Sequence, residues 1–334
     1  MGGMIFAPTV LADNLTETAG YKAGLTLSLD ELCDHLKEDR DLLLASEEQH
    51  VRIRSEVYDE MFYRLLHRIG HTEEQFNGDF TGAGLYHKYK DKHGDVYNSI
   101  LELFVEYGPK MIEAAKRNNT KTMDPEPFID AATRAHGPLG RVIALEKILA
   151  IANAQRLSPH SQNRHVQWNS RLALEELFKG GNTPPEKGQF LDQRFIDYLE
   201  ANDGKLSEMH WRKFEELTAE YFDREGYRIE LGPGGNDGGV DVRAWKPDQD
   251  QAPHMIIQCK RQKAKVEKVI VKALYTDLVD EGANYGLVVT TSELSPGARE
   301  VITGRGYPIE EVNRENLQQW LKKLRTPGTG IVRV

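Results

Sequence analysis

The stretch GGNDGGVDVRAWKPDQDQAPHMIIQCKRQ, residues 234–262, decides the fold of the C-terminal part of this chain. A glycine-rich turn is followed by apolar residues that predict a strand at residues 240–245, then a polar loop with two prolines, then a second strand at residues 255–259. If the two strands pair in antiparallel fashion, Asp241 on the first lies close to Gln258 on the second. The stretch therefore predicts a sheet in which polar side chains gather at two strand ends.

The second strand places polar groups where a core strand would have apolar ones. Side chains alternate between the two faces of a strand, so Gln258 and Lys260 point together while Cys259 points to the opposite face. Together with Asp241 they would gather a carboxylate, an amide or backbone oxygen, and a lysine. Phosphodiester hydrolysis uses these groups, as oxygen ligands for Mg²⁺ and as a cation near the attacking water and the scissile phosphate. The alternative without function is a strand that simply ends in polar residues.

Helices and strands alternate on both sides of this stretch. Before it, we expect a helix from Ser207 to Gly226 and a strand at residues 227–231. After it, the expected elements are a helix of about fifteen residues from Val266, a strand at residues 285–290, a helix capped by Ser295 with Pro296 at its first position, a short strand near Ile309, and a helix from Asn313 to Leu324. This order predicts an α/β sandwich, a mixed central sheet flanked by helices.

The N-terminal part of the chain shows helical spacing instead. Ser28 and Glu31 form a capping box. Apolar residues recur at helical spacing in residues 29–44, 50–69, 96–117, 140–155 and 169–178. We therefore predict an all-α domain at residues 1–180, a linker with a short helix at residues 181–204, and the α/β domain at residues 205–334.

Composition is that of a globular protein without a membrane span. Of the 334 residues, 39% are hydrophobic and 28% are charged, and no apolar run is long enough to cross a bilayer. The opening MGGMIFAPTV lacks the pattern of a signal peptide. The two cysteines, Cys33 and Cys259, are too few and too far apart for a disulfide framework. We expect a cytoplasmic protein.

The net charge of −9 is unevenly distributed. From Lys205 onward, 20 basic residues balance 20 acidic ones, so the whole acidic excess lies earlier in the chain. Within the later part, residues 260–272 hold six basic residues and one acidic residue. A basic patch of that density can neutralise several phosphates locally, and we expect Arg261, Lys263 and Lys265 to bind nucleic acid. Solvated side chains at the start of a helix are the alternative.

Four blocks of sequence together resemble a known family. They are WRKFEELTAEYFDREGYRIE, GGNDGGVDVRA, IIQCKRQKAKV and YGLVVTTSELSPGARE, which occur in this order between residues 211 and 300. The blocks are similar to the catalytic domain of Mrr-like restriction endonucleases, a branch of the PD-(D/E)XK nuclease superfamily in which glutamine replaces the second acid. The resemblance covers about 120 residues, the whole α/β domain. It does not extend to the first 200 or so residues.

The resemblance implies a role for each matching residue. Asp241 would be the metal-binding acid, Gln258 the second ligand or the group that positions water, and Lys260 the catalytic lysine. Cys259 would complete the metal site through its backbone oxygen, since its side chain belongs to the core rather than to a nucleophile. The metal would be Mg²⁺, with Mn²⁺ as a substitute.

A further acid is expected from the helix that precedes the sheet. The Phe-Glu pair of the family falls on Phe214 and Glu215. At 100° per residue, Glu215 borders the apolar stripe of the helix, whereas Glu216 lies nearly opposite and should be solvated. An ordinary surface carboxylate is the alternative for Glu215. Asp237, in the glycine-rich turn, is the weaker candidate.

These inferences predict a Mg²⁺-dependent endodeoxyribonuclease that acts in restriction or antiviral defence. A repair or junction-processing nuclease, or a silent nuclease fold that only binds DNA, are the alternatives. DNA is the expected partner, and a homo-oligomer is expected because cutting two strands with one site per chain favours a dimer. The helical N-terminal domain is expected to sense a regulatory ligand or protein partner, to recognise the target or to mediate oligomerisation.

Overall fold

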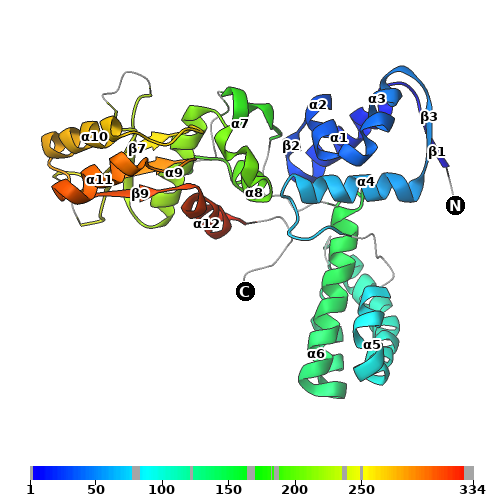
Figure 1. The fold of residues 1–334 in the computed structure, drawn as a ribbon. Helices are drawn as coiled ribbons and strands as arrows, with labels where there is room; N and C mark the ends of the chain where they lie inside the picture. The colour runs from blue at the N-terminus through cyan, green and yellow to red at the C-terminus, as the bar shows by residue number, and fades with distance from the viewer. Residues whose placement is uncertain are drawn as a thin grey trace.

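The computed structural model describes residues 3–76, 83–120, 123–163, 170–181, 183, 188–234, 239–248 and 251–326. It has a helical N-terminal body, a long helical hairpin that projects from it, and an α/β domain at the C-terminal end (Figure 1). Within those ranges, none of the helices combines the length and apolar character that a bilayer crossing requires. The predicted fold class is confirmed: a helical N-terminal region precedes a mixed-sheet domain.

The N-terminal body contains four helices and two pairs of short strands. The helices are α1 (Val10–Ala23), α2 (Leu29–His35), α3 (Arg40–Glu48) and α4 (Ser55–Arg68). The strands are β1 (Gly3–Phe6) antiparallel to β3 (Val51–Arg54), and β2 (Leu25–Thr26) parallel to β4 (Leu172–Ala173). The predicted capping box forms, because the Ser28 side chain accepts from the Glu31 N–H and the Glu31 carboxylate accepts from the Ser28 N–H.

Three predicted helices of this region are shorter than expected. Residues 51–54 are strand rather than helix, because Val51 and Ile53 are buried while the arginines between them are exposed, which is a period of two. Residues 37–39 interrupt the helix predicted at residues 29–44 with a 3₁₀ turn, which places Asp39 against Arg64 of α4 at 2.7 Å. Of the helix predicted at residues 169–178, only α7 (Glu175–Lys179) forms.

The hairpin consists of α5 (Ala83–Arg117) and α6 (Glu126–Leu157). The helices kink at His93 and at Gly137, and Pro138 follows the second kink. Their contact buries an apolar cluster of its own, centred on Tyr97 and Phe128. The hairpin is therefore a separately packed element (Figure 1).

Helix α8 (Gln193–Ala201) joins the N-terminal body to the α/β domain. Its Phe195, Ile196 and Leu199 belong to one continuous core that extends from α1 and α4 to the sheet. The buried Arg194 guanidinium donates to the carbonyl oxygens of Gly24 at 2.9 Å and Ser170 at 2.6 Å. The segment that the sequence assigned to a linker thus contains a buried structural helix.

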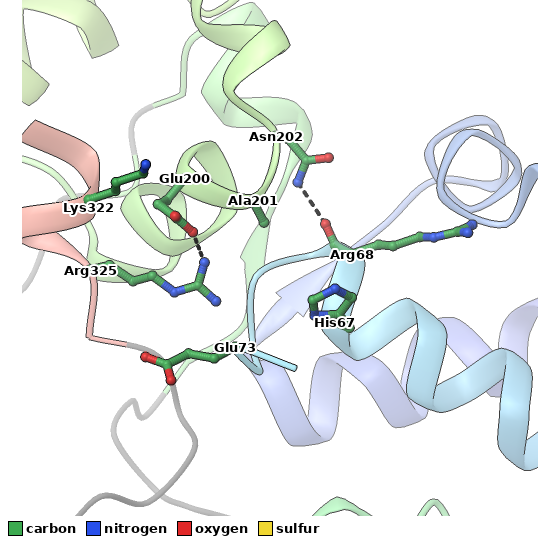
Figure 2. Close-up of a pocket in the computed structure, with 8 residues that line it drawn as sticks. All are labelled: His67, Arg68, Glu73, Glu200, Ala201, Asn202, Lys322 and Arg325. Atoms are coloured by element: carbon green, nitrogen blue, oxygen red, sulfur yellow. Dashed lines mark hydrogen bonds and ion pairs between the residues drawn. The ribbon is translucent and has the colours of Figure 1, made fainter. Parts of the chain in front are cut away.

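A polar cavity of about 500 Å³ lies where the end of α4 approaches α8 and the end of α12 (Arg314–Leu324). Figure 2 shows the Arg325 side chain paired with Glu200, and the Asn202 amide donating to the Arg68 carbonyl at 2.7 Å. Beside this cavity the chain turns at Gly70, which has a φ of 82°. A Cβ at this glycine would lie 2.1 Å from the carbonyl oxygen of Asp197, so only glycine fits between α4 and α8.

The buried carboxyl of Asp197, on α8 where it meets α4, makes the stability of the protein depend on pH. Burial raises the pKa of its carboxyl from 3.8 to about 6, against hydrogen bonds from Gln193 and the Thr326 N–H. Because the folded-state pKa is raised, stability is full below pH 3.8 and falls as pH rises to 6. We expect Asp197→Asn to remove this loss and to stabilise the protein above pH 6 by up to about 3 kcal/mol. Melting temperatures at pH 4, 5, 6 and 7.5 test this, and an equal gain at pH 4 and pH 7.5 would contradict it.

The α/β domain is built on a five-stranded sheet of order β5-β6-β7-β8-β9. The strands are β5 (Arg228–Leu231), β6 (Val242–Trp245), β7 (Met255–Lys260), β8 (Tyr285–Thr290) and β9 (Ile309–Val312). The first three pair in antiparallel fashion, and β7, β8 and β9 are parallel. The antiparallel pairing predicted for the two strands of the opening stretch is therefore confirmed.

Helices cover both faces of the sheet. On one face, α9 (Trp211–Arg224) and α12 pack against residues such as Ile257 and Cys259. On the other face, α10 (Lys268–Glu281) and α11 (Pro296–Arg305) pack against Ile256 and Val288. The caps predicted at Ser295 and Asn313 are confirmed. Helix α9 begins at Trp211 rather than at Ser207, because the His210 side chain caps it and residues 203–207 form a 3₁₀ turn.

Candidate active site

Asp241 lies at the point where β6 and β7 begin to pair. Its N–H donates to the carbonyl oxygen of Ile257 at 2.9 Å, in line with the pairing of Val242 and Ile257. The Cys259 N–H donates to Asp241 Oδ2 at 2.6 Å. The carboxylate, 7% exposed, is thereby fixed beside the end of β7. The structure thus brings Asp241 next to the residues with which the sequence grouped it.

Gln258 and Lys260 share the face of β7 that is covered by α10. Gln258 is 4% exposed, and within the described part of the chain its Oε1 has no hydrogen-bond partner. A buried carbonyl oxygen without a partner costs on the order of 1–3 kcal/mol. Lys260 follows two residues later at the half-buried end of the strand. An unsatisfied amide oxygen and an ammonium group therefore lie on one face, next to a buried carboxylate.

Cys259 faces the opposite side of the sheet. Its Sγ lies 3.5 Å from the Thr218 hydroxyl of α9. Burial first, and then the neighbouring Asp241 carboxylate, raise the pKa of the thiol well above its usual range. A thiol that stays protonated is a poor nucleophile. The side chain therefore acts as a core residue, and a metal-binding role for Cys259 would rest on its backbone oxygen alone.

Glu215 of α9 approaches the same strand end from the other face. It is 6% exposed and pairs with Arg212 at 3.0 Å, and Arg212 also donates to the Gly232 carbonyl at 2.7 Å. Glu215 also contributes to the raised pKa of the Cys259 thiol. Its burial agrees with its predicted place beside the apolar stripe. Arg212 links Glu215 to the loop after β5. The sequence indicated this role only through the position of Arg212, three residues before Glu215.

Glu216, which was expected to be solvated, is instead partly buried and bound to Lys213 at 2.8 Å. The reason is that α8 covers this face of α9, where the Lys213 ammonium lies 6.0 Å from the centre of the Phe195 ring. Helical periodicity identifies one buried face and cannot show a second helix on the other.

The glycine-rich turn comes close to the buried amide. Gly239 has a φ of 104°, and a Cβ placed on it would lie 2.9 Å from Gln258 Nε2 and 3.6 Å from Asp277 Oδ2. The approach of the turn to Gln258 therefore requires a glycine here. Asp237, Gly235 and Gly238 lie outside the described residues.

Asp277 of α10 is a neighbour that the sequence reasoning missed. Within the described residues its Oδ2 is buried and has no hydrogen-bond partner. Burial first, and then the acidic neighbours Glu281 and Asp280, raise the pKa of this carboxyl. The sequence could have indicated the burial of Asp277, because it lies three residues after Leu274 and one before Leu278, and both leucines are buried on the same helix.

These donors fit a hard divalent cation. Among the described residues, no group of three or more His, Cys, Asp or Glu side chains is arranged to hold a metal ion. The oxygens that are present come from the Asp241 carboxylate and the unsatisfied Gln258 amide, and Mg²⁺ prefers oxygen ligands of this kind. The oxygens at this strand end therefore suit the expected ion.

The basic residues after β7 differ in their surroundings. Arg261 donates to the Ser207 carbonyl at 3.4 Å. Lys265 pairs with Glu293 at 2.8 Å, and Glu293 also binds Arg299 at 3.2 Å. Lys263 is exposed and has no ion pair within the described ranges. Lys263 is therefore the most available of the three for a phosphate.

Comparison with known proteins gives a family match for the C-terminal domain. Residues 206–321 match the family described as "Restriction endonuclease". A curated relative, "Uncharacterized protein y4cE" of Sinorhizobium fredii, is 30% identical over 100 residues, which are 29% of this chain and 26% of that protein. The chain thus spans about a quarter of that relative's length. A solved structure titled "MspJI Restriction Endonuclease in Complex with 27-mer Oligonucleotide" aligns with 55% of this chain and 41% of its own, at 18% identity and a TM-score of 0.30.

The family match confirms the resemblance for the C-terminal domain. All four sequence blocks that carry the resemblance fall inside the matched range, and so do Asp241, Gln258 and Lys260. The N-terminal body and the hairpin lie outside it. Residues 206–321 therefore match a restriction endonuclease domain, and this domain is joined to a helical region that the match does not cover.

Proposed function

We propose that the restriction endonuclease domain of this chain is a Mg²⁺-dependent endodeoxyribonuclease, with Mn²⁺ as a substitute, that acts in restriction or antiviral defence. One observation carries the proposal. The Asp241 carboxylate is held by the Cys259 N–H at the end of β7, beside the face that presents Gln258 and Lys260. Restriction endonuclease domains generally use divalent metal ions, and the oxygens at this strand end suit one.

Each residue of the strand end has a distinct part in the proposed reaction. Asp241 and Gln258 would hold the ion, and the chemistry that it would supply when bound is a lower pKa for water and compensation of charge on the phosphate. Lys260 contacts the scissile phosphate and stabilises the negative charge that grows on it as water attacks and the P–O bond breaks. Glu215, paired with Arg212, holds a second carboxylate near the strand end from α9. The core beneath the site keeps these groups in fixed positions.

The test is incubation of the purified chain with supercoiled plasmid and Mg²⁺. We expect nicked or linear DNA, no reaction in EDTA, and recovery with Mn²⁺. Linear product without a nicked intermediate would support two sites acting together in a homo-oligomer. A chain that shifts DNA in gels but leaves it uncut with either ion would make this a DNA-binding domain.

The surface after β7 is proposed to bind the DNA backbone. We expect Lys263→Ala to weaken DNA binding and to reduce the slope of log affinity against log salt by about 0.9, the value for one lost phosphate contact. Lys265→Ala should change the slope less, because Glu293 already neutralises part of its charge. Gel-shift titrations at several salt concentrations measure both slopes.

Lys322→Ala is the matched control, since Lys322 is an exposed lysine near the end of α12, which packs on the opposite face of the sheet from α10. Its slope should equal that of the wild type. A Lys263→Ala slope that is also unchanged would remove this surface from the DNA interface.

The N-terminal region is proposed to recognise or sense rather than to cut. It carries the whole acidic excess of the chain, with 32 acidic and 23 basic residues before Lys205. Such a region repels DNA over its acidic parts and can attract the basic surface after β7. A regulatory ligand or protein partner that binds the N-terminal body or the hairpin could therefore change access to the nuclease site.

A further inference from the structure

We propose that Asp277 of α10 is an additional ligand of the metal site and supplies the carboxylate that β7 lacks at Gln258. The inference rests on the proposed function, since it concerns the same divalent ion. It departs from the four blocks that carry the family resemblance, because Asp277 lies between the third block and the fourth. It makes α10 part of the site in addition to covering the sheet.

The geometry comes from the space beside Gly239. The Cβ position of that glycine lies 2.9 Å from Gln258 Nε2 and 3.6 Å from Asp277 Oδ2. The amide of β7 and the carboxylate of α10 therefore border one small volume, which the glycine leaves open. A larger residue at position 239 would fill that volume.

Each of these two side chains has an acceptor oxygen without a partner among the described residues. Gln258 Oε1 and Asp277 Oδ2 are both buried, and within the described part of the chain neither has a hydrogen-bond partner. Native structures seldom leave buried polar atoms unpaired, and two such atoms are both acceptors here. The Gln258 amide presents Nε2 to the space that it shares with Asp277 Oδ2, and a half-turn of this amide, whose two ends have nearly the same shape, would present Oε1 there instead. A cation bound between the two oxygens would satisfy both.

The nearby cation is Arg243, whose charge partly offsets the burial that raises the pKa of Asp277 but whose guanidinium is held by another acid. Glu281, one turn further along α10, is paired with Arg243 at 2.6 Å. Asp280 is exposed on the same helix. Asp277 is thus the acid of this helix that faces inward, beside the amide that replaces an acid in the motif. With Asp241 it would give the site two carboxylates and one amide, the oxygen donors that Mg²⁺ takes.

The test measures metal binding without DNA, by electron paramagnetic resonance of free Mn²⁺ titrated with the full chain. We expect Asp277→Asn to weaken Mn²⁺ binding by at least about tenfold, the effect of removing a charged ligand. Asp280→Asn is the matched control, with the same charge change three residues away on an exposed face, and it should bind as the wild type does. Thermal unfolding verifies that both variants are folded.

A carboxylate exchange makes the test independent of folding losses. In the double variant Gln258→Glu with Asp277→Asn, the acid moves from α10 to β7, and Mn²⁺ affinity should return to within a few-fold of wild type. Wild-type affinity in Asp277→Asn, together with loss of binding in Asp241→Asn, would overturn the role of Asp277 and leave the proposed function standing. Unchanged Mn²⁺ binding in both Asp277→Asn and Asp241→Asn would instead overturn the metal site on which the proposed function rests.

Discussion

Asp241→Asn is expected to abolish DNA cleavage while leaving DNA affinity within a few-fold of wild type. The asparagine side chain keeps an oxygen that can accept from the Cys259 N–H, so the strand end should retain its structure. It loses the negative charge that holds the ion in the proposed function, which should remove several kcal/mol of transition-state stabilisation, or about 10³-fold or more in rate. Affinity for DNA is spread over many backbone contacts and should change little. Single-turnover cleavage and gel shifts measure the two quantities.

Lys260→Met should have a comparable effect, because it removes the cation that we propose to contact the scissile phosphate and keeps the length of the side chain. Asp248→Asn is the control, as Asp248 is an exposed acid in the loop between β6 and β7. Its cleavage rate should equal that of the wild type. Cleavage by Asp241→Asn within tenfold of wild type would place the reaction elsewhere in the domain.

Gly70→Ala is expected to destabilise the whole chain by about 3–5 kcal/mol, at the upper end of single substitutions. Two costs add. The alanine must adopt a φ of 82°, and its Cβ would lie 2.1 Å from the Asp197 carbonyl, so α4 and α8 must separate. Since a native protein is stable by only roughly 5–15 kcal/mol, the loss should appear as a large fall in melting temperature. Denaturant unfolding measures it directly.

Gly304→Ala is the control for this second prediction. Gly304 lies inside α11, and a Cβ there would meet no atom within 4 Å. Alanine favours a helix by about 1 kcal/mol over glycine, so this variant should be slightly more stable than wild type. Equal stability of Gly70→Ala and the wild type would show that α4 and α8 are not in the tight contact described above.

The sequence was sufficient for the α/β domain because its signals are local. Strand alternation and antiparallel pairing together placed Asp241 beside Gln258 and put Cys259 on the opposite face, as the structure has them. The caps at Ser295 and Asn313 also depend on neighbouring residues only. These predictions are correct because β6 and β7 are consecutive strands and their pairing involves residues that are close in sequence.

Features that depend on distant contacts could not be predicted. The burial of Glu216 follows from α8, which precedes it by about twenty residues and covers α9 from outside. The strand at residues 51–54 forms because β1, at the start of the chain, pairs with it. The position of Asp277 opposite Gln258 depends on how α10 packs on the sheet. In each case the partner lies in a segment whose position the local pattern does not give.

The burial of α8 sets where the nuclease domain can be cut out and joined to another protein. A fusion that begins at Lys205, where the sequence suggests a boundary, would discard Phe195 and Leu199 and expose the core of the domain to which they contribute, where α8 packs against α12. A fusion that begins at Gly188 keeps α8 together with its Asp192 cap. It also leaves Arg194 without the carbonyls of Gly24 and Ser170, which a designer would have to replace. A transferable form of the C-terminal domain therefore starts one helix earlier than its family match does.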